Sequence, residues 1–265
     1  MRDLWFERDG TRLYAVEDGE GPPLVMMHGG LADHRAIWRS VSGLADRCRV
    51  ICPDVRGNGR SHWAGPLDWR RLSEDLAALL DAIGATRAVV GGVSGGSGVA
   101  IRFALDHPGR VAGLILGLPH FPGGDIGQTD HQRSELAALS DLARRAPLEG
   151  MQVMSPAYAG LPEGAREGAL AMMASFDPAS FAATAAFLAS GVQPMASAAE
   201  LSRLTMPVLI QPGNDPMHPA EVSASYARAV PHAVVGDSIR DFCERLGDWR
   251  IRPGPGRADG PSRSG

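Results

Sequence analysis

The sequence contains no lysine, so all 26 of its basic residues are arginine. This absence excludes a lysine Schiff base, and it excludes the lysine of a phosphate-binding P-loop. The acidic residues number 30, which gives a formal charge of -4 and leaves no excess of basic residues for a nucleic-acid surface. We therefore expect no nucleic-acid partner.

Cysteine and long hydrophobic runs are also scarce. The three cysteines, Cys48, Cys52 and Cys243, are odd in number and match no metal-binding spacing, which indicates a reducing cytoplasm and no metal ion. No apolar run approaches a membrane span, and the first residues lack the apolar stretch of a signal peptide. We expect a cytoplasmic protein without a membrane segment. The abundance of Ala, Arg, Gly and Pro indicates a GC-rich bacterial genome.

Length and patterning favour one α/β domain, because 265 residues with 44% hydrophobic content can bury a full core. A hairpin is predicted at 4–9 and 11–17. Apolar runs that predict strands lie at 24–27, 49–52, 88–90, 111–118, 207–210 and 233–235, and those at 24–27 and 49–52 are typical of buried strands. Helical patterns lie between or after them, at 34–45, 72–83, 99–107, 219–229 and 238–247. This alternation predicts a mostly parallel sheet with helices on both faces.

The character of the chain changes after the strand predicted at 111–118. Residues 121–204 contain short runs rich in Ala, Leu and Met that are interrupted by Pro147, Pro156, Pro162 and Pro178. We interpret this segment as a small helical cap inserted into a core formed by residues 1–120 and 205–250. Residues 251–265 are mainly Gly, Pro, Ser and Arg, with little to bury, and predict a disordered tail.

The chemically most informative stretch is residues 92–96, which match G-x-S-x-G with Ser94 at the centre. An apolar run precedes it and a helical run follows, as in a sharp strand-to-helix turn that exposes a nucleophilic serine. A serine at positive φ needs neighbours without Cβ atoms where strand and helix pass closely. The Ser94 hydroxyl would stand at a helix N-terminus, which favours a developing oxyanion. A glycine-rich phosphate loop or a plain turn is the alternative.

Several motifs occur together in an order that resembles the α/β-hydrolase superfamily, over about residues 10–247. They are H-G-G at 28–30, D-x-R-G-x-G-x-S at 54–61, G-x-S-x-G at 92–96 and G-N-D at 213–215. Within that superfamily the chain is similar to small bacterial esterases and haloperoxidase-like enzymes with a short helical cap. The resemblance implies an α/β-hydrolase fold and a reaction that proceeds through the elbow serine.

The resemblance also implies roles for single residues. Ser94 would be the nucleophile, and the backbone N–H groups of Gly95 and Gly30 would form the oxyanion hole. For the H-G-G motif, a turn that merely requires glycine is the alternative. Asp215 follows a strand and would orient a histidine, in the chain order Ser…Asp…His that this fold uses. A solvated turn aspartate is the alternative for Asp215.

The histidine is where the chain departs from the superfamily pattern. The base should follow the last strand, but no histidine occurs after His232. His232 precedes that strand, so it should lie at the entry end of the sheet, away from the catalytic loops. His218 and His120 each follow a strand and should start on the catalytic face. His218 is the better substitute base, although it lies only three residues from Asp215, which makes the relay geometry awkward.

The remaining polar residues are given structural roles. His28 is expected to support the oxyanion loop, and Asp54 and Arg56 can brace the loops around the site. The other histidines are interpreted as surface or loop residues without metal-binding spacing: His34, His62, His107 and His131.

Three functions remain open at this point. The first is a serine hydrolase that acts on a small ester, thioester or related acyl substrate through an acyl-enzyme on Ser94, with no metal or organic cofactor. The second is a binding protein that keeps the fold and pocket but has weakened or lost turnover with the missing histidine. The third is another reaction, such as a lyase reaction or perhydrolysis, at Ser94. The complete elbow favours an enzyme, and the short segment after Val235 favours the binding protein.

Overall fold

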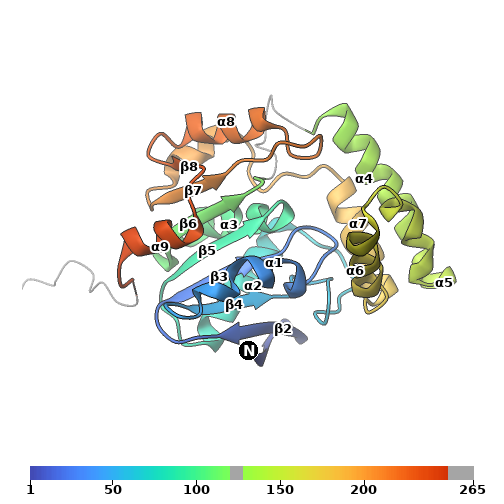
Figure 1. The fold of residues 1–265 in the computed structure, drawn as a ribbon, viewed down its shortest axis with the longest axis horizontal. Helices are drawn as coiled ribbons and strands as arrows, with labels where there is room; N and C mark the ends of the chain where they lie inside the picture. Colours follow the sequence, from blue (N-terminus) through green and yellow to red (C-terminus); the bar gives the residue numbers. More distant parts are fainter. Residues whose placement is uncertain (120–127, 250–265) are drawn as a thin grey trace, which may run out of the picture.

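A central sheet organises the protein, and a computed structural model describes residues 1–119 and 128–249 (Figure 1). Its strands run in the order β1-β2-β4-β3-β5-β6-β7-β8. Their bounds are β1 (Arg2–Arg8), β2 (Thr11–Asp18), β3 (Pro23–Met27), β4 (Arg49–Pro53), β5 (Ala88–Val93), β6 (Val111–Gly117), β7 (Val208–Gln211) and β8 (Val234–Val235). Strands β1 and β2 form an antiparallel hairpin. The neighbouring pairs β4–β3, β3–β5, β5–β6, β6–β7 and β7–β8 are parallel. The predicted mostly parallel sheet is confirmed.

Both faces of the sheet are buried, because successive side chains of a strand point to opposite faces. On β3, Leu24 and Met26 join one hydrophobic cluster, whereas Val25 and Met27 join another. The first cluster includes residues of α1 (His34–Val41) and α9 (Ile239–Leu246). The second includes residues of α2 (Trp69–Ala82), α3 (Gly95–Asp106) and α8 (Ala220–Ala229). The prediction of helices on both faces is therefore confirmed.

Most of the described part of the segment between β6 and β7 is helical. Its elements are α4 (Asp130–Ala143), α5 (Ala146–Glu149), α6 (Glu163–Met173), α7 (Pro178–Ala189) and the 3₁₀ helices η3 (Met151–Tyr158) and η4 (Ala198–Arg203). Figure 1 shows α4, α5, α6 and α7 gathered beside one end of the sheet. They share a small hydrophobic cluster that Leu31, from the loop after β3, also enters. We call α4 to α7 the cap helices.

The helix predicted over 34–45 ends earlier, with α1 stopping at Val41 and the 3₁₀ helix η1 (Ser42–Leu44) following it. A further 3₁₀ helix, η2 (Pro108–Arg110), leads into β6. His120, the start of the predicted cap and the predicted tail 251–265 lie outside the described residues. Within the described ranges, no helix has the length and apolar character needed to span a bilayer.

Candidate active site

Ser94 occupies a strained turn between β5 and α3, with φ 52° and ψ -116°. The flanking glycines explain how the turn fits. A Cβ atom on Gly92 would lie 2.4 Å from the backbone carbon of Gly96, and one on Gly96 would lie 2.4 Å from the backbone oxygen of His28. Strand, helix and neighbouring loop therefore approach too closely for side chains. Strain of this kind persists only where the surrounding structure imposes it, and it is frequent at functional sites.

A chain of hydrogen bonds joins Ser94 to two residues of the loop after β7. The Nε2 atom of His218 lies 2.9 Å from the Ser94 hydroxyl oxygen. On the other side of the ring, Nδ1 lies 3.1 Å from both carboxylate oxygens of Asp215. These distances are within the reach needed for a base to accept the proton of a nucleophile and for a third group to orient the base.

A tight turn brings Asp215 and His218 together despite their separation of three residues. The backbone N–H groups of Met217 and His218 donate to the Asp215 Oδ1 atom at 2.8 and 2.9 Å. The His218 N–H also lies 3.0 Å from the Asp215 carbonyl oxygen. An aspartate side chain that accepts from the backbone two and three residues later reverses the chain locally. The relay geometry that looked awkward from the sequence is thus supplied by the turn.

The charge of Asp215 follows from these bonds. Burial opposes ionisation of Asp215, but hydrogen bonds from the His218 ring and from the backbone of His218 and Met217 outweigh it, so the pKa of this carboxyl is lowered. An ionised Asp215 favours a proton on Nδ1 of His218. That tautomer leaves the Nε2 lone pair facing Ser94, which is the orientation that a general base requires.

The cap helices hold the same turn through Gln132, near the start of α4. The amide nitrogen of this buried side chain donates to the Met217 carbonyl at 2.6 Å. Its amide oxygen accepts from the Thr129 N–H at 2.7 Å, which completes a capping box at the start of α4. Sequence reasoning missed Gln132. The T-x-x-Q pattern at 129–132 predicts the capping box, but it does not predict the second contact.

The two glycines predicted for the oxyanion hole lie beside each other. A Cβ atom on Gly95 would lie 3.2 Å from the backbone nitrogen of Gly30. Gly95 is also the first residue of α3, and the first N–H groups of a helix have no acceptor within it. Both glycines line a cavity together with Ser94. Two N–H donors in such a position can stabilise a developing oxyanion.

The cap helices cover the cavity beside Ser94. The cavity has a volume of about 190 Å³. It is lined by Gly30, Leu31, Ser94, Gly95, Leu136, Leu139, Tyr158, Leu188, Met217 and His218. Three elements of the predicted cap contribute to this lining: α4, η3 and α7. The Ser94 hydroxyl therefore faces a mainly apolar chamber.

A family model described as the alpha/beta hydrolase fold matches residues 22–238. The chain belongs to this family. One relative, the magnesium-chelatase 30 kDa subunit of Rhodobacter capsulatus, is 29% identical over 240 residues, which cover 82% of this chain and 78% of that protein. Epoxide hydrolase A of Mycobacterium tuberculosis is 37% identical over 135 residues, which cover 48% of this chain and 42% of that protein.

Solved structures also resemble this α/β hydrolase. A thermophilic esterase from Thermogutta terrifontis superposes with a TM-score of 0.75 at 24% identity, and the match covers 93% of this chain and 99% of that chain. At this identity the likeness supports the fold alone. The expected fold and superfamily are confirmed by the family match together with this structural likeness.

In this α/β hydrolase, His28 braces the loop that carries Gly30. The Val55 N–H donates to His28 Nε2 at 3.0 Å, and Nδ1 lies 2.6 Å from the Gly29 carbonyl oxygen. Burial lowers the pKa of the His28 imidazole, despite opposing effects of Asp54 and of the Gly29 carbonyl. His28 is therefore a neutral ring with both nitrogens engaged. Its contacts agree with the structural role expected from the sequence.

Asp54 anchors the same region from the loop after β4. Its carboxylate accepts from the His34 N–H at 2.8 Å and the Arg60 N–H at 2.8 Å, and it lies 2.7 Å from His34 Nδ1. The interpretation of His34 as a surface or loop residue is wrong, because His34 begins α1 and its side chain is only 12% exposed. Nearby, the buried Arg56 guanidinium forms two bonds to Asp75.

Asp33, His34 and Asp54 form a group of possible metal ligands among the described residues, with ligand atoms within 4.8 Å of one another. Arg35 forms an ion pair with Asp33 at 2.6 Å, and Asp54 is occupied by backbone N–H groups and by His34. These contacts indicate that the three residues brace the loops around the site.

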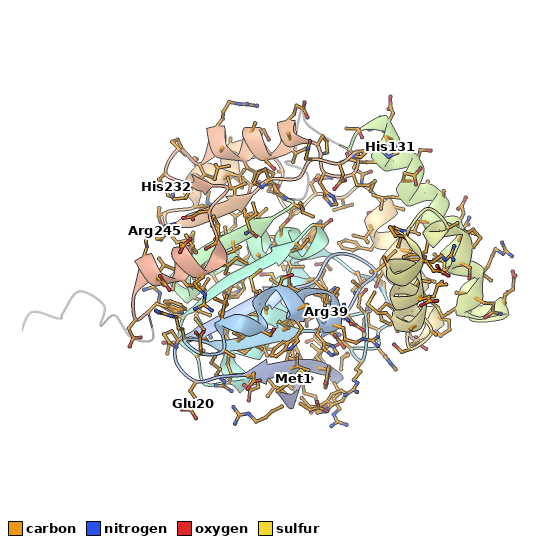
Figure 2. The ribbon with its side chains drawn as sticks, viewed as in Figure 1. Met1, Glu20, Arg39, His131, His232 and Arg245 are labelled. Atoms are coloured by element: carbon orange, nitrogen blue, oxygen red, sulfur yellow. The ribbon has the colours of Figure 1, made fainter. Side chains whose placement is uncertain are left out.

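His232 lies far from this site. Its Nε2 atom is 3.0 Å from the carbonyl oxygen of Met206, just before β7 begins, which places His232 at the entry end of the sheet. Figure 2 shows His232 well away from α4, which carries the labelled His131. The structure therefore brings Ser94, Asp215, His218, Gly30 and Gly95 together and leaves His232 apart.

Proposed function

We propose that this α/β hydrolase is a serine-dependent enzyme that hydrolyses a small ester, thioester or related acyl substrate through an acyl-enzyme on Ser94. The proposal rests on one observation above all, the hydrogen-bond chain from Ser94 through His218 to Asp215. A serine hydroxyl is a weak nucleophile near neutral pH unless a base within hydrogen-bond reach removes its proton. The position of His218 meets that need without a histidine after the last strand.

In the proposed reaction, Ser94 Oγ attacks the substrate carbonyl carbon while His218 Nε2 takes the hydroxyl proton. The backbone N–H groups of Gly30 and Gly95 stabilise the oxyanion that forms, and each such donor contributes about 3 kcal/mol to transition-state stabilisation. His218 then donates the proton to the leaving group, and the acyl group stays on Ser94 as an ester. Asp215 stabilises the imidazolium while the proton resides on the ring.

The second half of the reaction releases the acyl group. His218, again neutral, accepts a proton from a water molecule as the water oxygen attacks the acyl carbonyl carbon. The bond to Ser94 Oγ then breaks, and the proton passes from His218 to Ser94. Each group that acts in these steps is a side chain or a backbone N–H of this chain, so the mechanism requires no metal or organic cofactor.

A binding protein without turnover is the second candidate. A relative matched over most of both chains is named as a magnesium-chelatase subunit and not as a hydrolase. A binding protein would need the cavity but not an activated serine, so chemical reactivity of Ser94 separates the two candidates.

The test combines a fluorophosphonate probe, which labels activated serines, with a nitrophenyl ester assay. We expect the parent protein to be labelled and active. Ser94→Ala should lose both labelling and activity while its melting curve stays unchanged, because the substitution removes only one oxygen atom. Ser190→Ala, at the exposed end of α7, is the matched control. An unlabelled and inactive parent would favour the binding protein, and equal activity of Ser94→Ala and the parent would remove Ser94 from the mechanism.

A further inference from the structure

A second cavity continues from the chamber beside Ser94. It has a volume of about 370 Å³. Four residues line both cavities: Leu136, Leu139, Tyr158 and Met217. The second cavity runs along α4 and the end of η3, so it leads away from Ser94 between these two elements. We call the two cavities together the α4 groove.

The far part of the α4 groove is lined mainly by apolar side chains. The residues that belong only to the second cavity are Glu135, Ala138, Leu142, Pro156 and Ala157. Leu142 is half-buried, whereas Ala138, Pro156 and Ala157 are exposed. The groove therefore begins at Ser94 under the cap helices and reaches the protein surface at its other end.

Charge is distributed unevenly in the α4 groove. Among the described residues that line it, none is arginine, and the sequence has no lysine. Glu135, at the exposed end, carries the acidic charge of the lining. A carboxylate at the end of a bound acyl chain would find no cationic partner along the groove and would approach Glu135. Within the groove such a carboxylate would be desolvated without a partner, and at the exposed end it would lie beside the like charge of Glu135, so the groove discriminates against acidic tails.

Size supports a ligand that occupies both cavities. Small-molecule sites usually enclose about 300–1,000 Å³. The chamber beside Ser94 is smaller than that range, whereas the chamber with its continuation falls within it. A ligand whose carbonyl carbon lies at Ser94 can extend through the shared residues toward Ala157.

We propose that the α4 groove binds the tail of an unbranched, uncharged acyl chain while its carbonyl group lies at Ser94. The substrate class is thus an ester or thioester of a neutral acyl chain that is longer than the chamber can hold. This inference rests on the proposed hydrolase function. Each added methylene removes further apolar surface from water when the chain binds. The value of kcat/KM therefore rises about two- to fourfold per added methylene until the groove is filled. Methylenes of longer chains extend past the exposed end into water, so kcat/KM then reaches a plateau.

The first test compares 4-nitrophenyl esters from acetate to decanoate. Ala138→Trp places an indole in the second cavity, whereas Ala137→Trp adds the same group to an exposed neighbouring position of α4 that lines neither cavity. In Ala138→Trp, we expect the ratio of kcat/KM for decanoate to that for acetate to fall by about tenfold or more. Ala137→Trp should keep the parent ratio.

The second test concerns the charge at the rim. Glu135→Arg replaces an exposed acidic side chain with a basic one. The parent should prefer 4-nitrophenyl hexanoate to the mono-4-nitrophenyl ester of adipic acid by about tenfold or more, and Glu135→Arg should narrow that preference at least severalfold. The neutral ester serves as the internal reference for any general change in activity.

The outcomes separate this inference from the proposed function. If the parent hydrolyses acetate and decanoate esters equally well, and Ala138→Trp leaves their ratio unchanged, the groove does not bind the tail although Ser94 still catalyses hydrolysis. Preference of the parent for the adipate ester would overturn the neutral substrate class. If no ester is hydrolysed and the fluorophosphonate does not label Ser94, the proposed function itself fails.

Discussion

Two loops meet at Ser94, and they are held in contrasting ways. The loop after β3 is fixed from within the core, where His28 and Asp54 are almost fully buried and are bonded to backbone groups. The loop after β7 carries Asp215 and His218 near the surface, and the Asp215 side chain is 51% exposed. Its shape depends on the turn made by Asp215 and on the bond from Gln132.

The contrast indicates how the site is assembled. Groups of the core, His28 and Asp54, brace the region around Gly30. The position of His218 depends in addition on α4, through the Met217 carbonyl. The cap helices therefore contribute to the position of His218 and also line the cavity. Changes in the cap should affect the catalytic rate even where they do not contact the substrate.

The largest effect is expected from His218→Ala. This substitution removes the base of the proposed mechanism but leaves the proposed oxyanion donors and the cavity in place, so we expect the ester hydrolysis rate to fall by about 10³-fold or more. The rate and the melting curve should be measured together. His232→Ala should retain the parent rate, since His232 lies at the opposite end of the strands. Equal losses in the two variants would contradict the assignment of His218 as the base.

A smaller effect on the catalytic rate is expected from substitution of Gln132. Gln132→Glu keeps an oxygen for the Thr129 N–H but cannot, when ionised, donate to the Met217 carbonyl. Gln132→Met removes both bonds without adding charge. Because small misplacements of catalytic groups can be costly, we expect either variant to lower kcat by about 10- to 100-fold, with a smaller change in KM.

Thr129→Ala is the matched control for Gln132. It removes the N-cap hydroxyl, which costs about 1 kcal/mol of stability, but leaves the Gln132 amide free to reach Met217. Its kcat should therefore stay near the parent value. If Thr129→Ala lowers kcat as much as Gln132→Glu does, general loosening of α4 explains the effect and the specific bond does not.

The contrast between the loops also explains what the sequence could predict. The sheet was predictable because buried strands such as Leu24 to Met27 are continuous apolar runs, and the elbow was predictable because Gly92 and Gly96 have steric reasons to be glycine. These features depend on local sequence and on close packing, so their patterns can be recognised in the amino-acid sequence.

The geometry of His218 was harder to predict. Its distance from Ser94 depends on the turn after β7 and on the contact that Gln132 makes with Met217, 85 residues later. The sequence offered His218 as a candidate because it follows a strand, but spacing alone cannot show that Asp215 bonds the N–H groups of Met217 and His218. His34 was misjudged for a similar reason, since only the folded chain brings it beside Asp54.

Acid should weaken the core-held loop through His28. Burial lowers the pKa of its imidazole below the ordinary 6.5, although Asp54, Asp33 and the Gly29 carbonyl oppose this effect. Below about pH 6.5 the unfolded chain therefore binds a proton that the folded chain does not. This contribution to stability is complete above that pH and is lost as the pH falls, at no more than about 1.4 kcal/mol per pH unit for one proton.

The comparison for this prediction is His28→Gln, which cannot titrate and keeps an acceptor for the Val55 N–H. Urea unfolding at pH 7, 6 and 5 should show a shallower loss of stability in His28→Gln than in the parent. Asp54 titrates in a lower range: burial alone would raise the pKa of its carboxyl, but the hydrogen bonds from the His34 side chain and the Arg60 N–H outweigh burial and lower it. Identical slopes for the two proteins would show that His28 is not the group responsible.

The smallest effect is expected from supplying the histidine that is missing after the last strand. Insertion of Gly-His after Val235 lengthens the segment between β8 and α9 toward the form that the superfamily resemblance implies. His218 Nε2 is already 2.9 Å from Ser94 Oγ, so a second imidazole would have to displace it to act as the base. We therefore expect the inserted protein to hydrolyse esters within about twofold of the parent rate. The same insertion in His218→Ala tests whether the new position can reach Ser94 at all. A rise of orders of magnitude in the parent background would instead mean that His218 is a poor base and that the natural protein is a weakened hydrolase.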